Sequence, residues 1–265
     1  MLRPRIIPCL LIHNGGLVKT IQFGDPKYVG DPLNAVRIFN EKEVDELIVL
    51  DIDASRLGKS PNETLIAQLA AECRMPLCYG GGIKSVDQIE RLIGLGVEKV
   101  AVSSVIMSDP ELVSTASACV GSQSLVGVID VKATGIFKKP EVVILNATKR
   151  TGLEPVALAQ KLHELGVGEI VLNSVDRDGC MNGYDMDLVS RVREVVQVPL
   201  TVLGGAGSFE DIRELVAQHS LIGAAAGSLF VFKGKYRAVL INYPDRDTRD
   251  ALAGDALRNN SDQLS

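Results

Sequence analysis

The sequence contains no tryptophan, and aromatic residues make up only 4% of its 265 positions. Proteins that bind single-stranded nucleic acid rely on aromatic side chains for base stacking, so this kind of ligand is disfavoured. The net charge of −5 and the lack of a long basic run argue against nucleic acid in general. No uninterrupted apolar stretch of about 18 residues occurs, which argues against a membrane span.

The cysteines are few, scattered and odd in number, and no two of them form a CxxC pair. This pattern is typical of reduced thiols and predicts neither a metal centre nor a disulfide framework. Arg3 and Arg5 lead directly into an apolar segment, so the N-terminus lacks the charged, apolar and small-residue regions of a signal peptide. We therefore expect a cytoplasmic protein without a metal or other cofactor.

One carboxylate is missing where an internal comparison would place it. Segments 6–12 and 125–131 resemble each other as the first strands of two related halves. The second contains Asp130 near its end, whereas the first has Leu11 in the corresponding place. Because leucine has no titratable group, a proton-transfer mechanism that uses two carboxylates would have lost one of them here.

Short β-branched apolar runs alternate with amphipathic segments along nearly the whole chain, which predicts parallel strands buried on both faces and helices between them. The expected strands are 5–12, 46–52, 75–79, 98–103, 124–130, 168–174, 198–203 and 221–226. The expected helices are 31–40, 62–73, 86–95, 110–119, 155–165, 187–196 and 209–219. Eight such units favour a (β/α)₈ TIM barrel. A doubly wound open sheet is the alternative, and the absence of GxGxxG after the first strand weakens it.

The two halves repeat each other. Residues 75–85 match 198–208, and residues 46–53 resemble 169–176, so the pattern predicts one barrel of two half-barrels. We assign residues 1–243 to this domain. Segment 132–150 is too long for a simple connection and is expected to form a hairpin on the catalytic face. Residues 244–265 form a polar C-terminal tail that is expected to fray.

Two glycine-rich turns follow strands and precede helices, at 80–82 and 204–207. Without a Cβ, backbone N–H groups can approach an anion, and the next helix N-terminus favours negative charge. Ser103-Ser104 and Gly227-Ser228 close the next strand in each half. This duplication predicts two phosphate sites at the mouth of the barrel and a bisphosphorylated ligand; a tight turn without a ligand is the alternative for either turn alone.

Several polar residues fall between these two sites. Asp51 and Asp130 end apolar strands, where an unpaired carboxylate is costly and therefore indicates function. Asp53 and Asp176 could equally cap the loops that follow. Lys19 lies in the first long connection and could cover the ligand, with a solvated surface lysine as the alternative.

These motifs resemble the cyclase subunit of imidazole glycerol phosphate synthase over residues 1–232. The resemblance rests on Arg5-Ile6-Ile7-Pro8-Cys9-Leu10, Leu50-Asp51-Ile52, Gly80-Gly81-Gly82-Ile83, Asp176-Arg177-Asp178-Gly179 and Gly204-Gly205-Ala206-Gly207. It implies a partner glutaminase at the N-terminal face, whose ammonia passes through the barrel to a bisphosphorylated substrate. It also implies an ammonia gate, with plain structural salt bridges as the alternative for the same residues: Arg5, Glu46, Lys99 and Glu169. The phosphate- and ligand-binding positions that it implies are Lys19, Asp51, Gly82, Ser103, Ser104, Asn173, Asp178, Gly179, Gly204, Gly205, Gly227 and Ser228.

The departures from this family gather at the catalytic end. Its two catalytic aspartates fall at positions 11 and 130, where this chain has Leu11 and Asp130. Its asparagine–threonine pair appears as Ser103-Ser104, and a threonine is replaced by Asn173. Because a positioned acid or base contributes about 10²–10⁴-fold to a reaction, the resemblance leaves cyclase activity in doubt.

A closer resemblance is to the glycosyl amidation-associated paralogues of this subunit, through Cys9-Leu10-Leu11-Ile12, Pro76-Leu77-Cys78-Tyr79 and the segment 237–244. It implies a barrel that receives ammonia from a glutaminase and supports amidation of an N-acetyl sugar in surface-polysaccharide synthesis, with a sugar amidotransferase as a further partner. The alternatives are histidine-pathway cyclisation with Asp130 acting alone, and a non-catalytic scaffold for the glutaminase. A bound phosphorylated molecule, phosphate or sulfate is expected, although in the amidation role the anion sites could also bind nothing essential.

Overall fold

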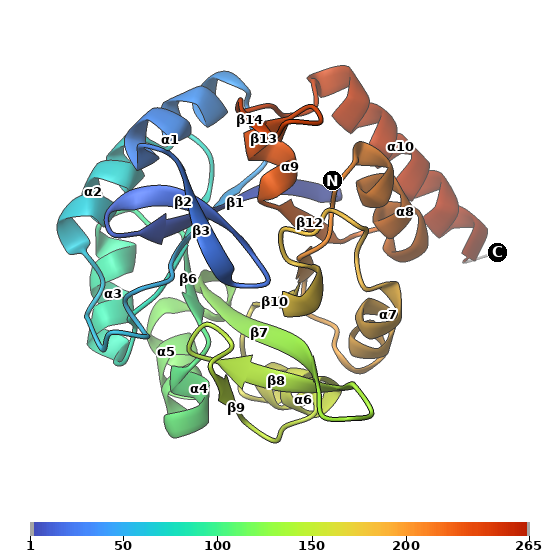
Figure 1. Cartoon of the computed structure of the whole chain (residues 1–265). Coiled ribbons are helices and arrows are strands. Elements are labelled where there is room, and N and C mark those ends of the chain that lie inside the picture. Colours follow the sequence, from blue (N-terminus) through green and yellow to red (C-terminus); the bar gives the residue numbers. More distant parts are fainter. Residues whose placement is uncertain (1–2, 264–265) are drawn as a thin grey trace.

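The computed structural model, which describes residues 3–263, contains a closed barrel of eight parallel strands with helices between them (Figure 1). This is a (β/α)₈ TIM barrel, as the alternation of apolar and amphipathic segments predicts. The barrel strands are β1 (Arg5–His13), β4 (Leu47–Asp51), β5 (Leu77–Gly80), β6 (Lys99–Val102), β7 (Leu125–Thr134), β10 (Glu169–Ser174), β11 (Leu200–Leu203) and β12 (Gly223–Ala226).

Each barrel strand pairs with its neighbours in parallel, and the β7–β10 pair joins the two halves. In this pair Asn173 lies beside Asp130, and β1 pairs with β12 to close the circle. The carboxyl ends of all eight strands therefore meet at one mouth, where the connecting loops gather.

Helices form the outer layer (Figure 1). The longer ones are α1 (Pro32–Glu41), α2 (Glu63–Glu72), α3 (Val86–Gly94), α5 (Glu111–Val120), α6 (Pro155–Glu164), α7 (Met186–Val195) and α8 (Phe209–His219). Two short helices follow barrel strands, α4 (Val105–Ser108) and α9 (Ser228–Val231), and 3₁₀ turns lie at Ser122–Ser124 and Val175–Arg177. Ser85 caps α3 by accepting from the Gln88 amide, and Ser208 forms a capping box with Asp211 on α8, so local side chains fix where these helices begin.

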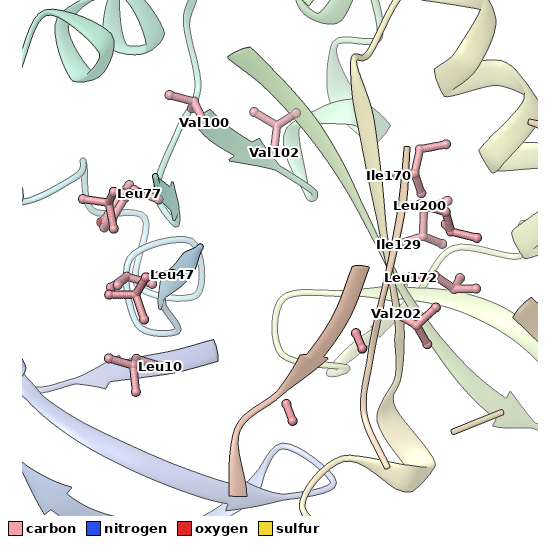
Figure 2. Close-up of a cluster of buried hydrophobic side chains, with 14 of the residues drawn as sticks. Leu10, Leu47, Leu77, Val100, Val102, Ile129, Ile170, Leu172, Leu200 and Val202 are labelled. Carbon is pink, nitrogen blue, oxygen red and sulfur yellow. The ribbon is translucent and has the colours of Figure 1, made fainter. Parts of the chain in front are cut away.

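The main hydrophobic core lies between the barrel wall and the helices. Leu10 and Leu47 from the strands belong to one buried cluster with Phe39 of α1 and Ile66 of α2. Figure 2 shows the strand side of this cluster around the wall. Full burial of each such side chain contributes about 1.5–3 kcal/mol, so this layer holds the barrel closed.

Additional strands extend the barrel at its carboxyl mouth: β2 (Gly16–Ile21), β3 (Gly24–Gly30), β8 (Lys139–Ile144) and β9 (Lys149–Arg150). β2 and β3 form an antiparallel hairpin that continues from β1, which the sequence patterns did not predict. In segment 132–150, where the sequence predicts a hairpin, β7 runs on and pairs antiparallel with β8. A third hairpin joins β13 (Phe232–Lys233) to β14 (Ala238–Val239).

The C-terminal tail differs from the sequence expectation. It forms helix α10 (Arg246–Gln263) rather than fraying from residue 244 onward. Leu252 and Ala256 are buried, and Arg249 donates to the Glu43 carbonyl and to Asp45, so packing and hydrogen bonds order a segment of polar composition. Over residues 3–263, no helix is long and apolar enough to cross a membrane.

Candidate functional site

The inside of the barrel is lined by a second, smaller apolar cluster. Along each strand these residues alternate with those that face the helices, because successive side chains of a strand point to opposite faces. The members of the inner cluster are Ile7, Cys9, Ile48, Cys78, Ala101, Val126, Val128, Val171, Leu203 and Ala225, with Leu11 and Leu50 packed against them.

A ring of charged side chains lies at the amino ends of these strands. Arg5 bonds Glu46 and, through Nη2 at 2.7 Å, Glu169 Oε1. Lys99 Nζ donates to Glu46 Oε1 and Glu169 Oε2, both at 2.8 Å. Thr201 Oγ1 donates to Glu169 Oε1 at 2.5 Å. Each carboxylate therefore binds both cations, and the ring closes across the barrel axis.

The charges of this ring stabilise one another. Burial alone would raise the pKa of Glu169, but Arg5 and Lys99 lower it below its ordinary value. Burial would likewise lower the pKa of Lys99, and the two carboxylates raise it instead. All four predicted gate residues are thus adjacent, with Thr201 as a fifth member that the sequence analysis did not identify.

A cavity opens at the opposite, carboxyl mouth and contains about 1090 Å³ of space between atoms, its open entrance included. Its walls come from both halves of the barrel. The predicted site residues that line it are Leu11, Lys19, Asp51, Gly82, Ser103, Ser104, Asp130, Asn173, Asp178, Gly227 and Ser228.

Gly179, Gly204 and Gly205 do not line this cavity. The Gly183 amide donates to the Gly205 carbonyl at 2.9 Å, and a Cβ on Gly205 would lie 2.1 Å from the Gly183 oxygen. The loop that follows β10 therefore lies on the second glycine turn and covers it. A Cβ on Gly179 would similarly meet the Thr20 carbonyl at 2.1 Å, so this glycine permits a close backbone approach.

Asp130 is a half-buried carboxylate that lines the cavity. It accepts a hydrogen bond from Asn173 Nδ2 at 2.9 Å, and Oδ1 of the same asparagine has no partner within the described residues. Burial raises the pKa of Asp130 to about 6, an effect that Asn173 opposes and Asp178 reinforces. Leu11, which lines the same cavity, brings no polar atom that could act with it.

This raised pKa predicts a pH-dependent gain in stability for Asp130→Asn. Because the folded pKa of about 6 lies above the ordinary 3.8, the carboxylate destabilises the fold progressively as pH rises from about 4 to 6, and fully above that. The variant lacks this cost, so at pH 8 its unfolding free energy should exceed that of the wild type by up to about 3 kcal/mol. Urea unfolding at pH 8 and pH 4.5 measures the difference, which should fall to about 1 kcal/mol at pH 4.5. An equal difference at both values would contradict the raised pKa.

Lys19 is not a surface lysine. It lies on β2 with 5% of its surface exposed, and its ammonium donates to the Cys9 carbonyl. Burial lowers the pKa of Lys19, while the charge of Asp178 opposes this shift. Burial likewise raises the pKa of Asp178, which accepts from Thr20 Oγ1 at 3.0 Å. The β2–β3 hairpin therefore places a cation inside the mouth rather than over it.

The remaining carboxylates divide into cavity and loop positions. Asp51 lines the cavity, and burial raises its pKa although the amides of Asp53 and Ala54 donate to it. Asp53 bonds His13 and the Asn14 amide, and Asp176 accepts from the Ala133 amide at 2.6 Å. Asp53 and Asp176 thus hold loops together, which is the structural alternative that the sequence left open.

Other cavity residues carried no sequence signal of their own. Ser55 Oγ accepts from the Gly82 amide at 3.1 Å, and Asn146 Nδ2 donates to the Ile52 carbonyl at 2.7 Å. Phe23 and Leu145 also line the cavity. Leu145 and Asn146 belong to segment 132–150, so only its expected place on the catalytic face pointed to them. Over residues 3–263, no three His, Cys, Asp or Glu side chains are grouped so as to hold a metal ion.

The fold and site define a TIM barrel with a charged ring closing one end of its lumen and a polar cavity at the other. The family model described as "Histidine biosynthesis protein" matches residues 5–237, and the chain belongs to this family. It is 56% identical over 252 residues to "Putative imidazole glycerol phosphate synthase subunit HisF" of Leptospira borgpetersenii, covering 95% of this chain and 99% of the relative. It is 57% identical to a similarly named Vibrio vulnificus protein, covering 92% and 94% of the two chains, and 39% identical to "Imidazole glycerol phosphate synthase subunit HisF" of Hyphomonas neptunium, covering 88% and 91%. Within the family the chain is therefore HisF-like.

Proposed function

We propose that this chain is the synthase subunit of a glutamine-dependent sugar amidation system. In this role it receives ammonia from a glutaminase at the amino face of the barrel and delivers it toward an N-acetyl sugar, which becomes an acetamidino sugar. The observation that carries the proposal is the contrast between a complete charged ring at one end and Leu11 in place of a carboxylate at the other.

The interior of the barrel suits a neutral molecule. Between the ring and the cavity the inner side chains are aliphatic or cysteine, and burial raises the pKa of Cys9 to about 12, so its thiol stays uncharged. Moving an ammonium ion from water into such a lumen has a large desolvation free energy, because the ion is charged. The desolvation free energy of neutral ammonia is much smaller. The ring and the apolar lining together therefore support passage of ammonia rather than ammonium.

The cavity supports delivery better than cyclisation. A cyclisation that needs an acid and a base on opposite sides of the substrate would find Asp130 on one wall and Leu11 on another. The ordinary contribution of one such group is about 10²–10⁴-fold. Phosphate-binding positions such as Ser104 and Ser228 remain at the mouth, so a phosphorylated ligand can still bind there.

Coupled turnover with a glutaminase and an N-acetyl sugar amidotransferase tests this proposal. Lys99→Met should lower the acetamidino sugar formed per glutamate released by at least about 10-fold, because an opened ring lets ammonia escape. Product formation from added ammonium should not change. Lys161→Met, an exposed lysine of α6, is the matched control and should keep the wild-type ratio. An unchanged ratio in Lys99→Met would contradict a gate and favour plain structural salt bridges.

A second candidate is the cyclase reaction of histidine biosynthesis, in which ammonia and a bisphosphorylated formimino substrate give imidazole glycerol phosphate and AICAR. The names of the relatives, such as the Hyphomonas neptunium protein, favour it, and so does the retention of Asp130 in the cavity wall. It requires that Asp130 act without a second carboxylate at position 11.

A further inference from the structure

Arg237 lies in the turn of the β13–β14 hairpin, beside the mouth of the cavity. Its Nη2 is 3.3 Å from the Ser228 hydroxyl and 3.3 Å from the Gly179 carbonyl, and its guanidinium carbon lies 4.8 Å from the centre of the Phe232 ring. Among the described residues no carboxylate forms an ion pair with it, and its hydrogen bonds to Ser228 and Gly179 both use Nη2. Most of the five donors of this guanidinium are therefore free to bind an anion.

The cavity is strongly asymmetric in charge. At the Ser228 end, the Lys19 ammonium lies close enough to Gly227 that a Cβ there would be 2.5 Å from Nζ. Arg237 lies beside the Ser228 hydroxyl and over the Phe232 ring. The ammonium of exposed Lys27 lies 5.1 Å from the centre of the same ring. Lys19 lines this end of the cavity, whereas Arg237 and Lys27 lie beside it and reach it only through Ser228 and Phe232. Asp178 is the carboxylate that acts on Lys19, and Asp130 lines the same cavity.

Among the described residues, no cation lines the other end of the cavity as Lys19 lines the Ser228 end. Its lining comes from hydroxyl and backbone groups, including those of Ser103 and Ser104, and no lysine or arginine of the described chain lines it. The cation near this end is exposed Lys59, which acts on Asp51. The Gly82 amide already donates to Ser55, and the nearest carboxylate is Asp51. Hydroxyls and amides can hold a polar neutral group there, but they offer an anion much less than a guanidinium does.

We propose that Arg237 makes the Ser228 end the principal anion site, so that the ligand carries a phosphate there and an uncharged polar group at the Ser104 end. The ligand class is therefore a phosphate monoester or diphosphate with one charged end, as in a phosphorylated sugar, and not a molecule with two equivalent phosphates. The inference rests on the proposed function in one respect: a chain that cyclises a bisphosphate needs anion sites at both ends.

Calorimetric titration with ribose 5-phosphate and ribose 1,5-bisphosphate tests the inference on the full chain. The wild type should bind the bisphosphate no more than about 10-fold more tightly than the monophosphate. Arg237→Gln should weaken monophosphate binding by about 10- to 100-fold, since it removes a charge-assisted contact to phosphate. Ser104→Ala, at the other end, should change it by less than about 3-fold.

Two further variants separate binding from folding. Lys233→Gln removes the same charge from an exposed position of the same hairpin and should bind like the wild type. Arg237→Lys keeps the positive charge but lacks the planar guanidinium, so its affinity for the monophosphate should lie between those of the wild type and Arg237→Gln. It takes the place of Arg237→Gln in the test if that variant unfolds. Wild-type affinity in both Arg237 variants, or no binding of either sugar phosphate, would overturn the inference while leaving ammonia delivery, measured by the coupling ratio, untouched. A different result would overturn both this inference and the proposed function. In that result the bisphosphate binds more than about 100-fold more tightly than the monophosphate, and Arg237→Gln and Ser104→Ala lose equal affinity.

Discussion

Glu169→Gln is expected to lower the free energy of unfolding by about 3 kcal/mol. The wild-type carboxylate is buried and accepts from Arg5, Lys99 and Thr201 at once. The amide has almost the same shape but no charge, so two cations would share the single carboxylate of Glu46. Breaking a buried ion-pair network in this way leaves an uncompensated charge, which is the costly case for buried salt bridges.

Urea unfolding at pH 7 measures this loss. Glu63→Gln is the matched control, because its ion pair with Arg91 is about half exposed on both sides and contributes little. The loss should shrink in acid: the pKa of Glu169 lies below its ordinary 4.5, so its contribution is present above pH 4.5 and disappears as pH falls through the folded value. A loss below 1 kcal/mol at pH 7 would contradict the closed ring.

Leu11→Asp is expected to create or increase cyclase turnover by at least about 10-fold, and at most by the 10²–10⁴-fold that one positioned acid or base supplies. Leu11 lines the cavity that also contains Asp130, so the new carboxylate would stand where the internal repeat and the resemblance both place the missing one. Production of imidazole glycerol phosphate from the bisphosphorylated formimino substrate and excess ammonium measures the gain.

Leu50→Asp is the control for this gain. Leu50 is a second half-buried leucine of the inner cluster and lines the same cavity, so the substitution introduces the same charge at the same depth. It should give no turnover above that of the wild type. Equal effects of the two substitutions would mean that position 11 has no special role, and the reading of Leu11 as a lost catalytic position would fail.

The barrel could be predicted from the sequence because each of its strands is a continuous apolar run. Such runs are typical of parallel strands that are buried on both faces. The β2–β3 hairpin was missed because residues 16–30 alternate glycine, charged and apolar residues without a clear period. Helix α10 was missed for a related reason. Within residues 246–256, whose burial is described, the buried apolar side chains are Leu252 and Ala256, and the helix also depends on contacts with distant residues such as Glu43.

The positions of candidate site residues on the barrel strands could be predicted from the sequence. The positions that depend on contacts between loops could not. Asp130 and Asn173 lie side by side on neighbouring parallel strands, so their contact follows from topology and register. The burial of Lys19 depends on the unpredicted hairpin, and the covering of Gly205 depends on the loop that carries Gly183. Thr201 joins the charged ring only because β11 brings its hydroxyl beside Glu169. Such long-range contacts leave no pattern in the local sequence.

The most direct test of the account is the turnover of the wild-type chain with the bisphosphorylated formimino substrate and a large excess of ammonium at mildly alkaline pH. External ammonia removes any need for a glutaminase, so the assay isolates the chemistry of the cavity. With the Hyphomonas neptunium relative assayed in parallel, the account predicts no imidazole glycerol phosphate, or a rate lower by at least about 10²-fold. Product formed at the rate of that relative would contradict it, and would show that Asp130 suffices without a carboxylate at position 11.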